Sequence, residues 1–190
     1  MADEVYAVMA GDIAVRASAE LADVYRQAFA GPPHNEPPEA ADRFRESLHR
    51  HSELPGFRAV AAWAPGADLV GFGYGHTSLP GQWWHDLVAA ALAPDVAARW
   101  LETPFVMVEL AVRPRRQREG IGGRLHDLLL ESTPHASAVL SARQDDADVQ
   151  RLYHGRGWQE IGRDVVPVPG GDPFVILARH LSGHPGVFLE

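Results

Sequence analysis

Apolar residues recur at two different spacings along this chain, and each spacing predicts its own kind of element. Leu21, Val24, Tyr25 and Ala28 follow the spacing i, i+3, i+4 and i+7, which is typical of one face of a helix. The run FVMVELAV, residues 105–112, is short and rich in valine, which favours a buried strand. The two patterns together predict a mixed α/β protein.

The predicted strands and helices alternate along most of the chain. A helical insertion at about 80–103 separates the third predicted strand from the fourth. We expect a single domain over 1–190 that ends in a loose tail, residues 182–190. The predicted strands are 4–16, 57–65, 68–78, 105–112 and 136–143 with a final hairpin over 159–181, and the predicted helices are 18–30, 39–51, 122–132 and 145–158.

Composition and charge narrow the function classes. Of 190 residues, 46% are hydrophobic, which is enough for a sizeable core, and the formal net charge is −8. This negative charge argues against broad nucleic-acid binding, which depends on neutralising phosphates. It is compatible with a cationic or amine-bearing partner, although solubility alone explains it equally well. All 17 basic residues are arginine, so a lysine-based mechanism is excluded.

The chain has no cysteine, which excludes disulfides, a thiolate nucleophile and cysteine-based zinc sites. Its ten histidines show no metal-ligand spacing, so no metal is expected. The first residues lack a signal-peptide pattern, and no run approaches the ~20 apolar residues of a membrane span. We therefore expect a cytoplasmic protein with no membrane partner.

A glycine-rich turn follows the strand predicted at 105–112. The stretch VRPRRQREGIGGRL, residues 112–125, places three glycines within four residues at the start of a helix. A helix N-terminus has unpaired N–H groups, and glycine lets an anion approach them, so the turn predicts a pyrophosphate cradle. The alternative is a helix start whose glycines only allow close packing.

Three classes of phosphate-binding loop compete for this turn. A P-loop needs a lysine, which this chain lacks. A dinucleotide fingerprint needs glycine or alanine where Leu125 stands. The third class is a coenzyme A pyrophosphate loop.

Two segments of the chain resemble the GNAT N-acetyltransferase superfamily, and the resemblance covers residues 105–160. The first segment has the pattern V-x-P-x-x-[QR]-x-x-G-x-[GA] after a strand. Its matching residues are Val112, Pro114, Gln117, Gly120 and Gly122.

The second segment, RQDDADVQRLYHGRGW, is similar to the R-x-x-N-x-x-x-x-x-x-Y-x-x-x-G-F pattern of the same superfamily. Arg143, Tyr153 and Gly157 match it, and Trp158 replaces phenylalanine. Asp146 replaces the usual asparagine, so it can still cap a helix but has lost the amide donor. The resemblance implies a contact with pantetheine at this position, which Asp146 would make without that donor.

The resemblance implies the GNAT acyl-CoA N-acyltransferase fold, an α/β (α+β) fold. Its mixed, mostly antiparallel central sheet has splayed central strands and is flanked by helices. The resemblance also implies acetyl-CoA as co-substrate, with pantetheine on the central strand and pyrophosphate in the glycine turn, where Arg116 or Arg118 would reach the phosphates. The residues implied in cofactor binding are Leu110, Ala111, Val112, Gln117, Arg118, Glu119, Gly120, Ile121, Gly122, Gly123 and Asp146.

The superfamily's reaction is direct attack of an amine on the acetyl thioester. Tyr153 occupies the superfamily's tyrosine position and is the candidate acid for the leaving thiolate; the alternative is a tyrosine packed on its helix. Glu109 is the candidate base or ammonium anchor, because a carboxylate within an apolar strand is costly unless it is paired or used. The alternative is a strand residue facing solvent or an arginine. Some relatives carry a glutamate on the next strand. The corresponding position here is at about Ser141, so this form of the base is missing.

The acceptor side is less defined. In the superfamily, the first two helices, their loop and the last hairpin shape the acceptor pocket, although polar residues there also suit solvated loops. The insertion's Trp83, Trp84 and Trp100 have three explanations: a lid, a homodimer contact, or plain packing on the sheet. The polar residues of the expected acceptor side are His34, Asn35, Glu36, Glu39 and Asp172.

These observations predict an N-acetyltransferase that transfers an acetyl group to a primary amine of a small molecule in a ternary complex. One alternative is acetylation of a protein N-terminus or lysine. Two others are a non-catalytic acyl-CoA-binding domain on the same fold and an interaction module without a cofactor.

Overall fold

The structure is a computed structural model that describes residues 4–131 and 133–181. Contacts divide the chain into two compact units. The first unit holds the residues up to His76 together with Met107–Glu131, and the second holds Thr77–Val106 together with the chain from residue 133. The single domain therefore stays a prediction, and the expected tail lies outside the described residues.

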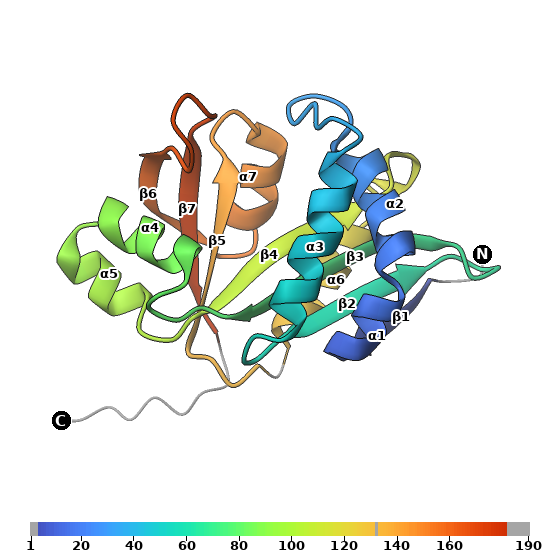
Figure 1. The fold of residues 1–190 in the computed structure, drawn as a ribbon, viewed down its shortest axis with the longest axis horizontal. Helices are drawn as coiled ribbons and strands as arrows, with labels where there is room; N and C mark the ends of the chain where they lie inside the picture. Colours follow the sequence, from blue (N-terminus) through green and yellow to red (C-terminus); the bar gives the residue numbers. More distant parts are fainter. Residues whose placement is uncertain (1–3, 132, 182–190) are drawn as a thin grey trace. The chain divides into compact units, whose positions relative to one another are not determined.

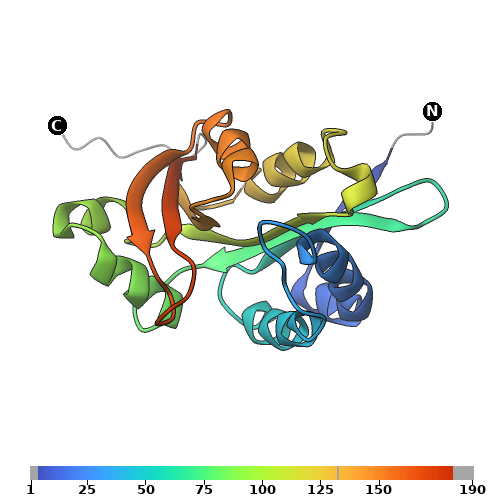
Figure 2. The same ribbon diagram turned by 90° about the horizontal axis from the view of Figure 1, so that it is seen from above.

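In the first unit, helices cover both faces of a set of strands. Figure 2 shows α1, α2 and α3 on one face and α6 on the other. β1 pairs antiparallel with β2, and β2 pairs antiparallel with β3. The helices and strands of this unit, labelled in Figure 1, are β1 (Val5–Met9), α1 (Gly11–Arg16), α2 (Ser18–Phe29), α3 (Ala40–Ser52), β2 (Arg58–Trp63), β3 (Leu69–Thr77), most of β4 (Phe105–Val112) and α6 (Ile121–Leu130). The 3-10 turn η1 (Pro114–Arg116) lies between β4 and α6 in the sequence.

The core of the first unit lies between the strands and the helices α2 and α3. Leu21, Val24, Phe44 and Leu48 are all buried, as their helical spacing predicts. The ring of Phe44 lies 5.4 Å from that of Phe72 on β3. Burying each such side chain stabilises the fold by about 1.5–3 kcal/mol, so these contacts hold both helices on the sheet.

On the other face, α6 packs where β3 has no side chains. A Cβ atom on Gly71 would lie 3.0 Å from both the Ala111 carbonyl oxygen and Leu125 Cδ1. On Gly73 it would lie 3.2 Å from the Glu109 carbonyl oxygen. β3 therefore needs glycine here because β4 and α6 approach it closely. Leu125 is fully buried and fixes α6 in this position.

The expected strand over 4–16 is wrong in its second half. β1 ends at Met9, and residues 11–16 form α1. A Cβ atom on Gly11 would lie 2.8 Å from the Ser52 carbonyl oxygen, so the chain turns against the end of α3. Ala14 is fully buried, so this short helix contributes a residue to the core.

The second unit combines a strand hairpin with three helices. β4 pairs in parallel with β5 at Phe105 and Val106, and β5 pairs antiparallel with β7 over its whole length. β6 and β7 form the expected hairpin, but β7 lies between β5 and β6. Besides the start of β4, the elements are α4 (Trp83–Ala91), α5 (Pro94–Trp100), β5 (Ser137–Arg143), α7 (Ala147–His154), β6 (Gln159–Val165) and β7 (Phe174–His180).

The strand order through the shared strand β4 is β1-β2-β3-β4-β5-β7-β6. Every pairing above is antiparallel except that of β4 with β5. The expected mixed, mostly antiparallel sheet flanked by helices is therefore confirmed. Within the described residues, the helices are too short or too polar to cross a membrane.

The insertion is helical, as expected, and two of its tryptophans pack on the second unit's strands. The ring of Trp100, which is 3% exposed, lies 4.2 Å from that of His180. Trp84 Nε1 donates a hydrogen bond to Ser141 Oγ at 3.3 Å. Packing therefore accounts for Trp84 and Trp100, whereas Trp83 is 65% exposed.

Candidate functional site

Hydrogen bonds hold the glycine turn against the sheet at the end of β4. The backbone N–H of Arg113 donates to the Val70 carbonyl at 2.8 Å, and Arg113 Nε donates to the Leu69 carbonyl at 2.6 Å. Gln117 Nε2 donates to the Val112 carbonyl at 3.1 Å. The direction in which the chain leaves the strand is thus fixed before α6 begins.

The first turn of α6 presents its N–H groups without a side-chain cap. Gly120 precedes the helix with a φ of +84°, in the left-handed region that favours glycine. The first helical bond runs from Arg124 N to the Gly120 carbonyl at 3.0 Å, so the three amides between them have no partner within the helix. A Cβ atom would meet nothing within 4 Å at Gly120 and only Val112 Cγ2, at 3.6 Å, at Gly122. This end of α6 can bind an anion.

The arginines of the turn are less available than the sequence indicates. Arg116 Nε donates to Glu119 Oε2 at 2.7 Å, and the same guanidinium also pairs with Glu4. The hydrogen bond from Arg116 lowers the pKa of the Glu4 carboxyl. Arg116 would therefore have to leave two carboxylates to reach a phosphate. Arg118 has a φ of +65°, and its contact with a phosphate stays a prediction.

The middle of β4 is only partly buried. Val108, Glu109 and Leu110 keep some exposure, whereas Met107 and Ala111 on either side are buried. A strand in the middle of a helix-covered sheet is normally covered on both faces. The partial exposure therefore marks an opening against this strand.

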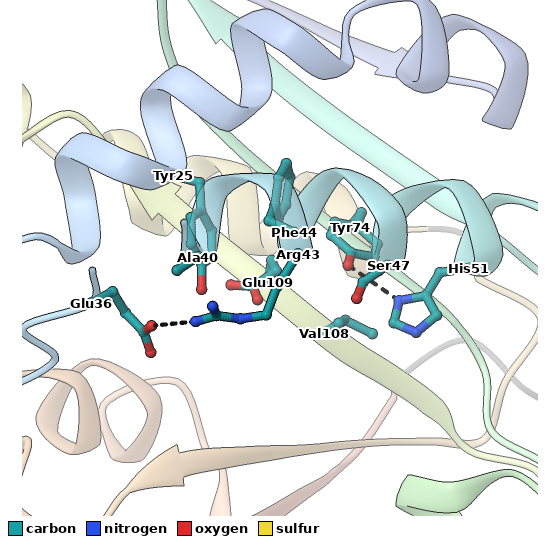
Figure 3. A pocket seen from close by; sticks show the side chains of 10 residues that line it. All are labelled: Tyr25, Glu36, Ala40, Arg43, Phe44, Ser47, His51, Tyr74, Val108 and Glu109. Atoms are coloured by element: carbon teal, nitrogen blue, oxygen red, sulfur yellow. Dashed lines mark hydrogen bonds and ion pairs between the residues drawn. The ribbon is translucent and has the colours of Figure 1, made fainter. Parts of the chain in front are cut away.

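A pocket of about 240 Å³ lies at this opening (Figure 3). Helix α3 supplies half of its lining, and α2, the loop before α3, β3 and β4 supply the rest. The structure thus brings Glu109, the candidate base, into the same pocket as Glu36 of the expected acceptor side. The lining residues are Tyr25, Glu36, Ala40, Arg43, Phe44, Ser47, His51, Tyr74, Val108 and Glu109.

Glu109 forms no hydrogen bond or ion pair with another residue of the described chain. Burial, together with the negative charge of Glu36, raises the pKa of its carboxyl from 4.5 to about 8. A general base works best when its pKa lies near the operating pH. Glu109 can therefore accept a proton from an amine near neutral pH.

Tyr25, Tyr74 and His51 line the same pocket and were missed by the sequence analysis. Burial raises the pKa of both tyrosines. Burial also lowers the pKa of His51 to about 4, so its imidazole is neutral at pH 7. His51 Nδ1 lies 3.2 Å from the Tyr74 hydroxyl, and the two groups form an uncharged hydrogen-bonded pair.

Of the residues expected on the acceptor side, Glu36 alone is among the described residues that line this pocket. Asp172 instead forms an ion pair with Arg143 in the second unit. His34 packs its ring 4.8 Å from that of Phe29. Asn35 and Glu39 likewise lie outside the lining. Within the described chain, no three histidine or acidic side chains are grouped so that they could hold a metal ion.

The second unit holds the other candidate catalytic residue. The Asp146 side chain accepts a hydrogen bond from the Val149 backbone N–H at 3.0 Å, which confirms its capping of α7. Tyr153 is 7% exposed, and its ring lies 5.6 Å from that of Trp158 in an edge-on contact. Packing explains much of its position, and its role as an acid stays a prediction.

Comparisons with known proteins point to one class. No family model matches the chain. A GCN5-like protein acetyltransferase of Mycobacterium tuberculosis is 34% identical over 131 residues, which cover 64% of this chain and 63% of that protein. The chain therefore matches less than two thirds of the length of this curated relative.

Solved structures show the same fold. A protein of Desulfovibrio desulfuricans, described as a candidate acetyltransferase of the GNAT family, has a TM-score of 0.67 and 16% identity, covering 94% of this chain and 99% of its own. A candidate acetyltransferase of Salmonella typhimurium, solved with its cofactor acetyl-CoA, has a TM-score of 0.62 and 13% identity, covering 96% of each chain. The fold of this chain is that of the GNAT acetyltransferases, and the resemblance found in the sequence is confirmed.

Proposed function

We propose that this chain is an acetyl-CoA-dependent N-acetyltransferase that acts on a primary amine of a small molecule. The observation that carries the proposal is the state of Glu109. This carboxylate lies on a central strand at the pocket, has no ion-pair partner among the described residues, and has a pKa of about 8. Such a group is costly to the fold and is typical of a site that handles protons.

The proposed donor site is the glycine turn with the strand before it. The free N–H groups at the start of α6 suit the pyrophosphate of acetyl-CoA, and the space at Gly120 and Gly122 lets it approach. The backbone of residues 110–112 would hold the pantetheine arm, as in the superfamily. The acetyl-CoA in the similar Salmonella typhimurium structure supports this assignment.

Each proposed catalytic residue moves one proton. Acetyl-CoA, when bound, supplies the thioester carbonyl carbon that an amine can attack. Glu109 takes a proton from the acceptor's ammonium group and so provides the neutral amine. Tyr153 is the proposed source of the proton that neutralises the sulfur when the carbon–sulfur bond breaks, and the second proton that the amine nitrogen loses as the amide forms restores the phenol. No cysteine is present, which favours direct transfer over a covalent cysteine intermediate.

Acetylation of a protein is the second candidate function. The observation that favours it is the similarity to the Mycobacterium tuberculosis relative, which is described as a protein acetyltransferase. A pocket of about 240 Å³ is large enough for one small amine or one side chain but not for a folded surface. Competition between free amines and peptides in one acetylation assay distinguishes the two functions.

Thermal unfolding with acetyl-CoA, coenzyme A and ATP is the first test. Saturation at about 100 times Kd should add ~2.7 kcal/mol of stability, which raises the Tm by several degrees. Acetyl-CoA and coenzyme A should raise it, and ATP should not. No rise in Tm at millimolar acetyl-CoA would refute both the proposed donor site and the proposed enzymatic function.

An acetylation assay then tests the role of Glu109. Glu109→Gln should keep the Tm rise with acetyl-CoA but lose roughly 10²–10⁴-fold in turnover, because glutamine cannot accept the proton. Glu46→Gln, which changes an exposed carboxylate on α3, is the matched control and should leave turnover unchanged. Full activity of Glu109→Gln would contradict the proposed base.

A further inference from the structure

A positive side chain lies in the pocket that the proposed function assigns to an amine. Arg43 of α3 lines the pocket, and its Nη2 lies 3.6 Å from Glu36 Oε2. Their side chains are 62% and 37% exposed. Figure 3 shows the guanidinium extended toward Glu36. A long ion pair between exposed side chains contributes little to stability, so a ligand can replace either partner.

The charges around the pocket nearly cancel at pH 7. Arg43 and Glu36 carry opposite charges. Without a ligand, Glu109 is mostly protonated, because burial raises its pKa to about 8, and a bound ammonium group favours its ionised form. His51 is neutral, because burial lowers its pKa to about 4. A ligand with only positive charge would meet Arg43 without compensation, whereas a ligand that is neutral overall but carries both charges matches the pocket.

We propose that the acceptor is a compact amino acid-like zwitterion, whose ammonium group binds at Glu109 and whose carboxylate binds at Arg43. The inference rests on the proposed function and defines its substrate class. A guanidinium binds a carboxylate through two parallel N–H···O bonds, a stronger arrangement than the 3.6 Å contact with Glu36. The carboxylate of the ligand therefore takes the place of Glu36.

The rest of the lining defines the body of this acceptor. Tyr25, Phe44 and Tyr74 present aromatic surface to the pocket, which favours an apolar or aromatic side chain on the amino acid. In a peptide the α-carboxylate is replaced by a neutral amide, which cannot form the paired contact with Arg43. The arrangement therefore favours a free amino acid over a protein N-terminus.

Matched ligands test the inference by binding rather than by turnover. Calorimetry on the full chain saturated with coenzyme A compares L-phenylalanine with phenethylamine, which lacks the carboxylate, and with phenylalaninamide, which models a peptide. L-leucine, isoamylamine and leucinamide form a second set. In at least one set the amino acid should bind about tenfold or more tightly than both analogues, as expected for a charge-assisted contact.

Two arginine variants locate the effect. Arg43→Gln should abolish the preference for the amino acid while leaving the binding of the simple amine unchanged. Arg45→Gln is the matched control, because Arg45 lies on the same helix, is exposed, and pairs with Asp42 at 4.0 Å outside the pocket lining. It should keep the full preference.

Every other result overturns the inference. Equal binding of the amino acid and the amine, tighter binding of the amide, or no binding by either set at about 10 mM would each do so. The acetylation assay separates this failure from that of the proposed function. Acetylation of amines without preference for a carboxylate overturns only the substrate class. Selective amino acid binding without turnover overturns the proposed acetyltransferase activity but supports the proposed ligand class.

Discussion

Replacing Glu109 by glutamine should make the protein more stable at alkaline pH. The folded state raises the pKa of Glu109 from 4.5 to about 8, so it holds this proton more tightly than the unfolded chain does. The stability of the parent protein therefore falls as the pH rises from about 4.5 to about 8, and levels off above that. At 1.36 kcal/mol per pH unit the full effect is about 5 kcal/mol, and the partial exposure of Glu109 reduces it to roughly 2–4 kcal/mol.

Urea unfolding between pH 5 and pH 9 measures this difference directly. Glutamine cannot ionise and copies the shape of a protonated carboxyl group, so the variant should match the parent at pH 5 and exceed it at pH 8 and above. Glu46→Gln controls for the loss of a carboxylate as such, because Glu46 is exposed on α3. The same dependence of stability on pH in the parent and in Glu109→Gln would refute the argument that Glu109 lacks a charged partner in the folded state.

Three further substitutions test the donor site, the acid and the packing of β3. Gly122→Trp should abolish the Tm rise with acetyl-CoA, because the indole would cover the start of α6. The control Gly31→Trp, where nothing lies within 4 Å of an added Cβ atom, should keep the rise. A retained rise in Gly122→Trp would contradict the proposed pyrophosphate site. Tyr153→Phe should lower turnover and leave the Kd for acetyl-CoA nearly unchanged, and unchanged turnover would leave this tyrosine a packing role only. Gly71→Val should lower the free energy of unfolding, measured in urea, by about 1–3 kcal/mol or more, because its Cβ atom would lie 3.0 Å from the Ala111 carbonyl oxygen. An unchanged free energy of unfolding would contradict this close approach.

The periodic patterns in the sequence predicted most of the elements because each has one buried face. Leu21 and Val24 mark α2, and Phe44 and Leu48 mark α3, at helical spacing that the structure buries as expected. Residues 11–16 were mistaken for strand because a six-residue helix is too short to show a helical period. The position of β7 between β5 and β6 depends on long-range pairing, which no local pattern encodes.

The sequence pointed to Glu109 because a single charge in an apolar strand stands out. It did not point to Tyr25, His51 or Tyr74, because each has an ordinary packing role in its own element and they meet only in the folded unit. Arg43 was missed for a similar reason. On an exposed helix face one arginine among several looks like a solvated charge, and its place at the pocket depends on how α3 packs on the sheet.

The two bare positions of β3 have a consequence for how this chain can diverge. Gly71 leaves its space to Leu125 of α6, and Gly73 has Leu129 of the same helix 3.6 Å from where its Cβ atom would be. A side chain at either position would meet a backbone carbonyl oxygen of β4, from Ala111 or Glu109, as well as a leucine of α6. A smaller residue on the helix therefore cannot make room for a larger one on the strand. A library randomised at all four positions should return glycine, or at most alanine, at 71 and 73 whatever it returns at 125 and 129.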